Sequence, residues 1–233
     1  MRSPIIMVLL AAPSLAVGPD GAVLYFDFSA GVENLARRDD ILRLNGARHT
    51  NLKHDPMQLP GSKALEFRNA FDVAETDMAR LLDKVQAASA GGWFYTRRKG
   101  EQVLLSRGLP EIDPLGNRLF RPETDWVNFV LGTDQRGFVY GTINGNGEMP
   151  FAHVTVDELP INTWNQLVVV KTAKGYQEFY RNGTLVHTDR ESTWQPKVHV
   201  FHDTSPGATV RLSVQQGGLI GEAWVYPRAL TAD

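Results

Sequence analysis

Two tryptophans of this chain stand beside polar loop residues, where their rings could bind a sugar. Trp126 follows Thr124-Asp125, and Trp194 precedes Gln195-Pro196. Aromatic rings are large apolar surfaces with a defined geometry, on which the apolar faces of sugars stack. Partly buried packing explains both residues equally well, so both interpretations stay open. The other tryptophans lie inside apolar runs and are expected in the core: Trp93, Trp164 and Trp224.

Four arginines are compatible with an acidic ligand. Arg97 and Arg98 form a basic turn, and Arg118 and Arg121 lie in a long loop rich in proline, glycine and charge. A guanidinium group binds a carboxylate through paired hydrogen bonds, which suits an acidic polysaccharide. A solvated rim accounts for the same arginines. The predicted ligand-binding residues are Trp126, Trp194, Arg118 and Arg121.

His199 and His202 do not make a metal site on the strand predicted at 197–202. Successive side chains of a strand point to opposite faces, so residues three apart point away from each other. His202 with Asp203 stays open as a polar pair at the rim. The sequence also lacks a Gly-x-Ser-x-Gly nucleophile turn, a phosphate-binding P-loop and a dinucleotide-binding glycine motif.

Short β-rich runs separated by turn residues must position these side chains. We predict strands at 23–28, 64–67, 91–96, 102–108, 126–132, 137–143, 152–156, 165–171, 175–181, 184–188, 197–202, 210–214 and 219–226. Short strands at this spacing are typical of two packed antiparallel sheets, and Asn182-Gly183 predicts a type I′ turn. Apolar residues at near-helical spacing predict a short surface helix or turn over 73–89. Residues 32–62 are expected to be irregular.

The composition excludes several function classes. The formal net charge is −2, with 24 lysines and arginines against 26 aspartates and glutamates. The sequence therefore favours neither a nucleic acid nor an anionic membrane as a partner. The chain has no cysteine, which rules out a disulfide framework and a thiolate metal site.

The N-terminus has the pattern of an export signal. Arg2 supplies a positive charge, Pro4 to Ala12 are mostly apolar, and Ser14-Leu15-Ala16 offers small residues before a cleavage position. The apolar run is too short to span a bilayer as a helix. We predict a signal peptide over 1–16, one domain over 17–233 and a secreted or periplasmic bacterial protein. A buried first strand or a tail is the alternative for the first residues.

Several phrases resemble the laminin-G-like modules of the concanavalin A-like superfamily. They are Tyr25 to Phe28 (YFDF), Gln102 to Gly108 (QVLLSRG), Leu159 to Val169 (LPINTWNQLVV) and Ile220 to Tyr226 (IGEAWVY). The resemblance implies an all-β fold, a two-sheet antiparallel jelly-roll β-sandwich. Because the family usually continues past its last strand with a helical turn, we expect this chain to be either the N-terminal part of a longer protein or a shortened form of one. The fold itself does not determine a function.

Some laminin-G-like modules bind calcium at the rim of the sandwich. Calcium takes about six to eight oxygen ligands. The resemblance makes Asp27 and Glu222 the expected ligands, with Asp113 and Asp203 as further candidates. Gly221 stands where the family phrase commonly has an aspartate, which removes one contribution. Ca²⁺ is therefore the one cofactor that the sequence suggests, and its presence stays open.

One enzyme family on this fold cleaves glycosidic bonds with a Glu-x-Asp-x-x-Glu motif on a single strand. The nearest phrase here is Glu111 to Gly116 (EIDPLG), in which glycine replaces the last acid and Pro114 interrupts strand pairing. A solvated loop is the better interpretation. A divergent enzyme would draw its two carboxylates from separate strands, such as Asp27 and Glu222.

We expect an extracellular, non-catalytic module that binds carbohydrate or another extracellular surface ligand. One alternative is a divergent polysaccharide-degrading hydrolase or lyase on the same fold, which two carboxylates in an open groove would favour. The other alternative is a structural spacer or protein-interaction domain. A smooth face without an exposed ring would favour the spacer.

Overall fold

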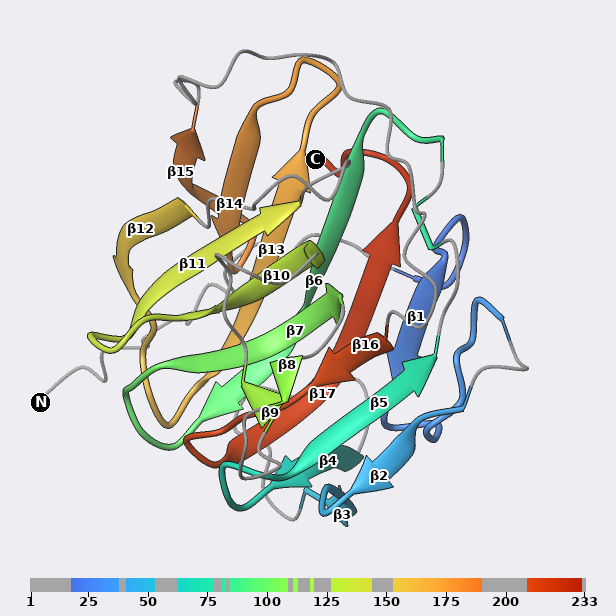
Figure 1. Cartoon of the computed structure of the whole chain (residues 1–233), viewed down its shortest axis with the longest axis vertical. Helices are drawn as coiled ribbons and strands as arrows, with labels where there is room; N and C mark the ends of the chain where they lie inside the picture. The colour runs from blue at the N-terminus through green and yellow to red at the C-terminus, as the bar shows by residue number, and fades with distance from the viewer. Residues whose placement is uncertain are drawn as a thin grey trace, which may run out of the picture.

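The computed structural model describes residues 18–37, 41–52, 63–77, 81–82, 84–108, 111–112, 118–119, 127–143, 153–189 and 209–231. They form two antiparallel β-sheets that pack face to face as a sandwich (Figure 1). No helix occurs among these residues. The prediction of an all-β, two-sheet antiparallel jelly-roll sandwich is confirmed.

The first sheet has eight strands. Their order is β15-β14-β13-β6-β17-β4-β3, and β1 pairs with the C-terminal part of β17. The strands are β1 (Leu24–Asp27), β3 (Arg48–Asn51), β4 (Lys63–Phe67), β6 (Ala88–Thr96), β13 (Trp164–Lys171), β14 (Gln177–Arg181), β15 (Thr184–Asp189) and β17 (Gly218–Tyr226). The central pair, β6 and β17, joins segments that are far apart in the sequence (Figure 1).

The second sheet has seven strands in the order β12-β11-β10-β7-β16-β5-β2. The strands are β2 (Arg43–Asn45), β5 (Val73–Asp77), β7 (Gln102–Gly108), β10 (Val127–Thr133), β11 (Phe138–Ile143), β12 (His153–Glu158) and β16 (Thr209–Leu212). A separate small hairpin consists of β8 (Glu111–Ile112) and β9 (Arg118–Leu119).

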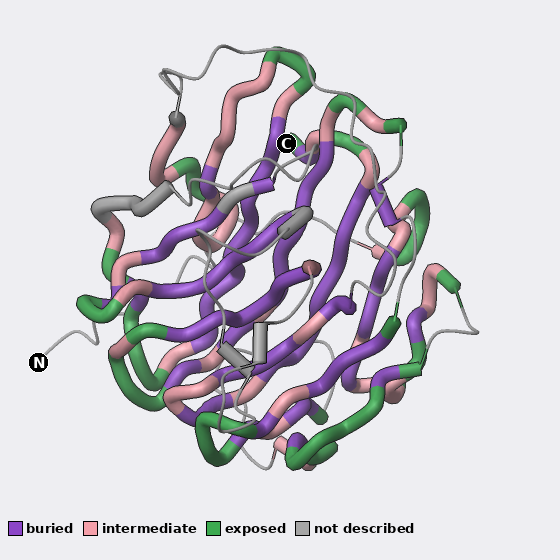
Figure 2. The backbone as a smooth tube through the Cα atoms, viewed as in Figure 1, coloured by how far each residue is buried: buried purple, intermediate pink, exposed green. Residues whose placement is uncertain are grey.

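The core lies between the two sheets, because alternate residues of each strand point inward. In β4, Leu65 and Phe67 are fully buried and Glu66 between them faces outward. The opposite sheet contributes residues such as Phe129 and Val210 to the same apolar cluster. Figure 2 shows buried residues along the strands and exposed residues in the turns. Outward-facing side chains are therefore the ones available for function.

The helix or turn predicted over 73–89 is wrong at its start. Val73–Asp77 form β5, which pairs with β16 on one side and β2 on the other. Ala74 belongs to the core, whereas Glu75 lies on the outer face, so the period is two. Leu81 and Leu82 are buried in turns beyond the strand. Together with Val73 they produce an apolar spacing close to that of a helix.

Part of the segment expected to be irregular forms two edge strands, β2 and β3. They lie in different sheets, so the chain crosses the sandwich at Gly46-Ala47. Gly46 has a φ of 83°, and a Cβ there would lie 2.3 Å from Asp72 Oδ1. β2 is exposed throughout and β3 nearly so. Without a buried face, neither strand shows the alternation that reveals a strand in the sequence.

The turn predicted at Asn182-Gly183 is confirmed. Asn182 has a φ of 50° and Gly183 a φ of 76°, and a type I′ turn requires positive φ at both positions. Gln166 N–H donates to Asn182 Oδ1 at 2.8 Å, and Asn182 N–H donates to Gln166 O at 2.9 Å. These bonds join the β14–β15 turn to β13.

Candidate functional site

The outer face of the eight-stranded sheet carries a cluster of aromatic rings. Tyr25, Trp224 and Tyr226 are buried there in a second apolar cluster, and Trp93 packs partly buried against it. Residues Leu35, Ala36, Ala229 and Leu230 from two loops belong to the same cluster. Trp164 and Trp224 are thus buried as predicted, and Trp93 is half-buried.

The expected calcium ligands Asp27 and Glu222 lie directly opposite each other in the β1–β17 pair. Residues paired in this way have Cβ atoms about 4.5–5.5 Å apart. The Tyr25 hydroxyl donates a long hydrogen bond to Glu222 Oε2 at 3.4 Å, and Ser29 N–H donates to Asp27 Oδ1 at 2.8 Å. Glu222 is buried and Asp27 is half-buried. The pair therefore consists of one shielded carboxyl group and one more accessible carboxylate.

Glu222 has a strongly perturbed ionisation. Burial is the largest cause, the Asp27 carboxylate adds to it, and together they raise the pKa of Glu222 to about 7 although the Tyr25 hydrogen bond opposes the shift. Burial and the same two carboxylates raise the pKa of Tyr25 above its ordinary value. The Glu222 carboxyl is therefore protonated below neutral pH and loses its proton as the pH rises through about 7.

Asp27 and Glu222, the two residues predicted to bind calcium, would supply only part of the ligands that a calcium ion needs. In the described part of the chain, no three His, Cys, Asp or Glu side chains gather where they could hold a metal ion. Asp27 and Glu222 together supply at most four carboxylate oxygens, and calcium takes about six to eight. The further candidates Asp113 and Asp203 lie outside the described residues. The pair could hold a Ca²⁺ only with additional oxygen ligands.

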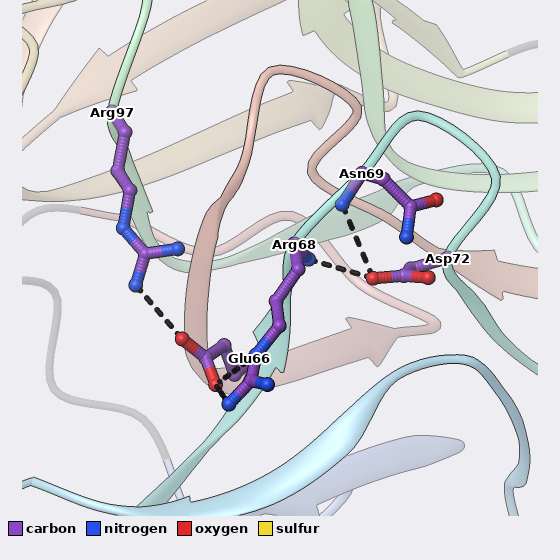
Figure 3. Close-up of polar contacts among 5 residues, drawn as sticks. All are labelled: Glu66, Arg68, Asn69, Asp72 and Arg97. Atoms are coloured by element: carbon purple, nitrogen blue, oxygen red, sulfur yellow. Dashed lines mark hydrogen bonds and ion pairs between the residues drawn. The ribbon is translucent and has the colours of Figure 1, made fainter.

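A cluster of arginines surrounds Glu66 on the same outer face (Figure 3). Arg68 Nε and Nη2 donate to Glu66 Oε2 at 2.9 and 2.7 Å. Arg97 Nη2 donates to Glu66 Oε1 at 3.0 Å. Arg48 is the cross-strand neighbour of Glu66 in the β3–β4 pair. We call these four residues, Arg48, Glu66, Arg68 and Arg97, the arginine rim.

The arginine rim is held in place by backbone contacts. Asp72 Oδ2 accepts hydrogen bonds from Arg68 N–H at 2.6 Å and Asn69 N–H at 3.2 Å (Figure 3), which fixes the turn after β4. Arg97 N–H donates to Gly217 O at 2.9 Å. Burial acts to raise the pKa of Glu66, but hydrogen bonds from Arg68 and Arg97 outweigh it, so the pKa is lowered. Glu66 therefore stays ionised at neutral pH.

An aromatic ring lies close to this rim. Cross-strand pairing places Glu66 beside Leu219, Leu219 beside Tyr95, and Tyr95 beside Trp164. Tyr95 is half-buried and meets the buried Trp164 edge-on, with ring centroids 5.7 Å apart. Tyr95, Leu219 and Trp164 make up what we call the Tyr95 site. It combines an accessible ring with the charged arginine rim two strands away.

The outer face of the seven-stranded sheet carries a small apolar cluster, Val103, Val130 and Tyr140, and paired charges on β2, β5 and β16. Glu75 accepts a hydrogen bond from Asn45 Nδ2 at 3.2 Å and forms an ion pair with Arg211 Nε at 3.4 Å. Arg43 forms a two-bond pair with Asp77, at 2.9 and 3.1 Å. Glu75 is thus paired with Arg211, and Asp77 is paired with Arg43.

Most of the predicted ligand-binding residues fall outside the part of the chain that the structure describes. Only the backbone of Arg118 is described, in β9. The remaining predicted ligand-binding residues and histidines lie outside the described residues: Trp126, Trp194, Arg121, His199 and His202. Their roles stay predictions. Of the basic turn, Arg97 belongs to the arginine rim and Arg98 is exposed beside it.

Comparison with known families agrees with this architecture. The model of a family described as "Concanavalin A-like lectin/glucanases superfamily" matches residues 72–233. The chain belongs to this superfamily. A search of curated proteins found no match to this chain.

Solved structures extend the comparison of this concanavalin A-like domain. The receptor binding domain of botulinum neurotoxin C/D mosaic serotype is 11% identical with a TM-score of 0.63, covering 92% of this chain and 50% of that one. The botulinum neurotoxin serotype D ligand binding domain in complex with N-acetylneuraminic acid is 10% identical with a TM-score of 0.64, and the match covers 92% of this chain and 49% of that one. The binding domain of Paraclostridial Mosquitocidal Protein 1 is 11% identical with a TM-score of 0.63, and the match covers 92% of this chain and 50% of that one. This domain spans about half of each, and such identities show the fold alone.

Sequence reasoning missed most of the surroundings of Arg97. The alternation of β4 does place Glu66 on an outer face, but Arg68 and Tyr95 join it only through the β4–β17–β6 register. That register connects strands far apart in the sequence, and no local pattern encodes it. In the described part of this concanavalin A-like domain, no helix is long and apolar enough to cross a membrane.

Proposed function

We propose that this domain is a non-catalytic module that binds carbohydrate at the Tyr95 site. The observation that carries the proposal is the half-buried Tyr95 ring in register with Leu219, two strands from hydrogen-bonding side chains. Protein sites for small ligands combine an apolar or aromatic surface with a few placed polar groups. The ring would stack on the apolar face of a sugar, and arginine N–H groups would bind its oxygens.

The structural neighbours support a binding role in general. Two are described as a receptor binding domain and a binding domain, and a third as a ligand binding domain in complex with N-acetylneuraminic acid. Because sites vary freely on one fold, these likenesses favour the class of function without selecting a ligand. The ligand must be sought with this chain itself.

A glycan-array screen followed by calorimetry tests the proposal. We expect binding of at least one glycan, and Tyr95→Ala to weaken it about tenfold, or about 1.4 kcal/mol. Tyr176→Ala is the matched control, since Tyr176 is also half-buried but lies in the β13–β14 turn. Circular dichroism checks that both variants fold. Binding that survives Tyr95→Ala but is lost in Trp126→Ala or Trp194→Ala would move the site to those predicted residues.

A second candidate function is glycoside hydrolysis by Asp27 and Glu222. It is favoured by their direct opposition across β1 and β17 and by the raised pKa of Glu222. A retaining glycosidase uses two carboxyl groups about 5–5.5 Å apart, one of them protonated. Against it stands the burial of Glu222. Release of reducing sugar that disappears in both Glu222→Gln and Asp27→Asn would support catalysis; unchanged oligosaccharides would leave the non-catalytic role.

Export and calcium binding are further parts of the proposal. The predicted signal peptide at 1–16 supports export, and N-terminal sequencing of the exported protein is expected to begin at Val17. The Asp27–Glu222 pair supports a Ca²⁺ contribution, which repeating the glycan screen with a chelator would detect. Complete insensitivity of both binding and melting temperature to the chelator would remove calcium from the proposal.

A further inference from the structure

The geometry points to a carboxylate on the ligand of the Tyr95 site: we propose that the domain prefers acidic sugars and that the arginine rim binds their carboxyl group. This inference rests on the proposed function and specifies its substrate class. It is carried by the arrangement of Arg68 and Arg97 around Glu66, which fixes two guanidinium groups at one edge of the site (Figure 3).

Glu66 holds the two guanidinium groups without consuming their hydrogen-bonding capacity. The Arg68 and Arg97 side chains are 56% and 41% exposed, whereas that of Glu66 is 14% exposed. A guanidinium group has five N–H donors. Arg68 uses Nε and Nη2 on Glu66, and Arg97 uses only Nη2. Both arginines thus present further donors, oriented in advance, to an incoming anion.

The charge of the rim also favours an anion. Arg48, Arg68 and Arg97 bring three positive charges, and Glu66 and Asp72 bring two negative ones. Arg48 is exposed and sits opposite Glu66 across the β3–β4 pair, and no described contact engages its guanidinium. A net positive charge therefore remains where a ligand would approach.

The spacing suits a sugar that bears its acid beside the ring. Glu66 and Tyr95 are separated by β17, so they lie roughly 10 Å apart, two strand spacings. A ring stacked on Tyr95 and Leu219 would direct its carboxylate toward Arg97. The planar guanidinium fork matches a carboxylate through two parallel N–H···O bonds. Arg68 directs Nε and Nη2 to the single oxygen Oε2 of Glu66, and Arg97 binds Oε1 through Nη2 alone.

The test compares acidic oligosaccharides with their neutral counterparts on the full chain. Galacturonate, mannuronate, glucuronate and sialic-acid oligosaccharides are each paired with the carboxyl-reduced form, and sulfated oligosaccharides form a separate arm. We expect at least one acid to bind about 10- to 100-fold more tightly than its reduced form, the range for hydrogen bonds to charged groups. The Arg68→Ala/Arg97→Ala variant should lose that preference.

Arg136→Ala is the matched control. Arg136 donates hydrogen bonds from Nε and Nη2 to Asp134, two residues away, at 3.1 and 3.0 Å. Arg68 binds Glu66 through the same two atoms, but Arg136 lies in the β10–β11 turn of the other sheet. An equal loss in Arg136→Ala would mean a non-specific charge effect and overturn the inference. So would equal binding of acids and reduced forms, or binding of sulfated sugars alone; in those cases the proposed carbohydrate function would survive. No glycan binding at all would overturn both.

Discussion

At neutral pH the Glu222 carboxyl is near the midpoint of its titration, since burial and then Asp27 raise its pKa to about 7. In the unfolded chain the same group titrates near pH 4.3. The folded state therefore binds this proton more tightly, and the resulting stability is present below pH 4.3 and is lost as the pH rises through 7. The direction is opposite to that of a carboxylate in a salt bridge.

Glu222→Gln is expected to remove this dependence. We predict that the free energy of unfolding of the parent protein falls by roughly 1–3 kcal/mol between pH 5 and 8 on account of this group, at 1.36 kcal/mol per pKa unit. The variant should show a flatter profile and gain most relative to the parent at pH 8. Urea denaturation at several pH values measures both. Parallel profiles for the two proteins would show that Glu222 ionises normally.

At the scale of elements, the crossing between β2 and β3 depends on Gly46. Its φ of 83° and the 2.3 Å approach of Asp72 Oδ1 to a Cβ both exclude a side chain. Gly46→Ala should therefore destabilise the domain by about 1–3 kcal/mol, because the Asp72 carboxylate would have to move away from the new Cβ. Gly18→Ala is the control, because no atom lies within 4 Å of a Cβ there. Equal urea midpoints for the two variants would contradict this account.

Elements with one buried face could be predicted from the sequence, and those without one could not. β7, β13 and β17 follow clear apolar patterns and lie where predicted, with small differences at their ends. The edge strands β2 and β3 are almost wholly exposed, so their composition resembles that of a loop. β5 is not predicted as a strand because the turns after it also supply apolar residues, Leu81 and Leu82, to the core. The strand alternation and the spacing of these leucines then overlap in one segment.

The candidate sites show the same division. Asp27 and Glu222 were named together because a family resemblance covers both ends of the chain, and the β1–β17 register brings them together. Nothing similar links Arg97 with Glu66 and Arg68. Their contact depends on the order β6-β17-β4 in the sheet, which a single sequence does not encode beyond the local alternation of each strand.

For the whole molecule, strand β17 joins two regions that respond differently to pH. It carries Glu222, which titrates near 7, and Leu219, beside the arginine rim. The arginines stay charged, and the lowered pKa of Glu66 keeps it ionised. We predict that affinity for an acidic glycan is constant within about twofold from pH 5 to 8, since no rim group titrates there. Thermal stability should fall over the same range.

Calorimetry and thermal melting on the same samples, at fixed ionic strength, would measure the two profiles together. Salt must be held constant because it screens the contribution of exposed charges. If affinity falls in step with melting temperature, β17 transmits the ionisation of Glu222 to the Tyr95 site. In that case Glu222→Gln should flatten both profiles at once. If only the stability profile changes in the variant, the sheet keeps its acidic pair and its binding face energetically separate, as sites without shared partners are expected to behave.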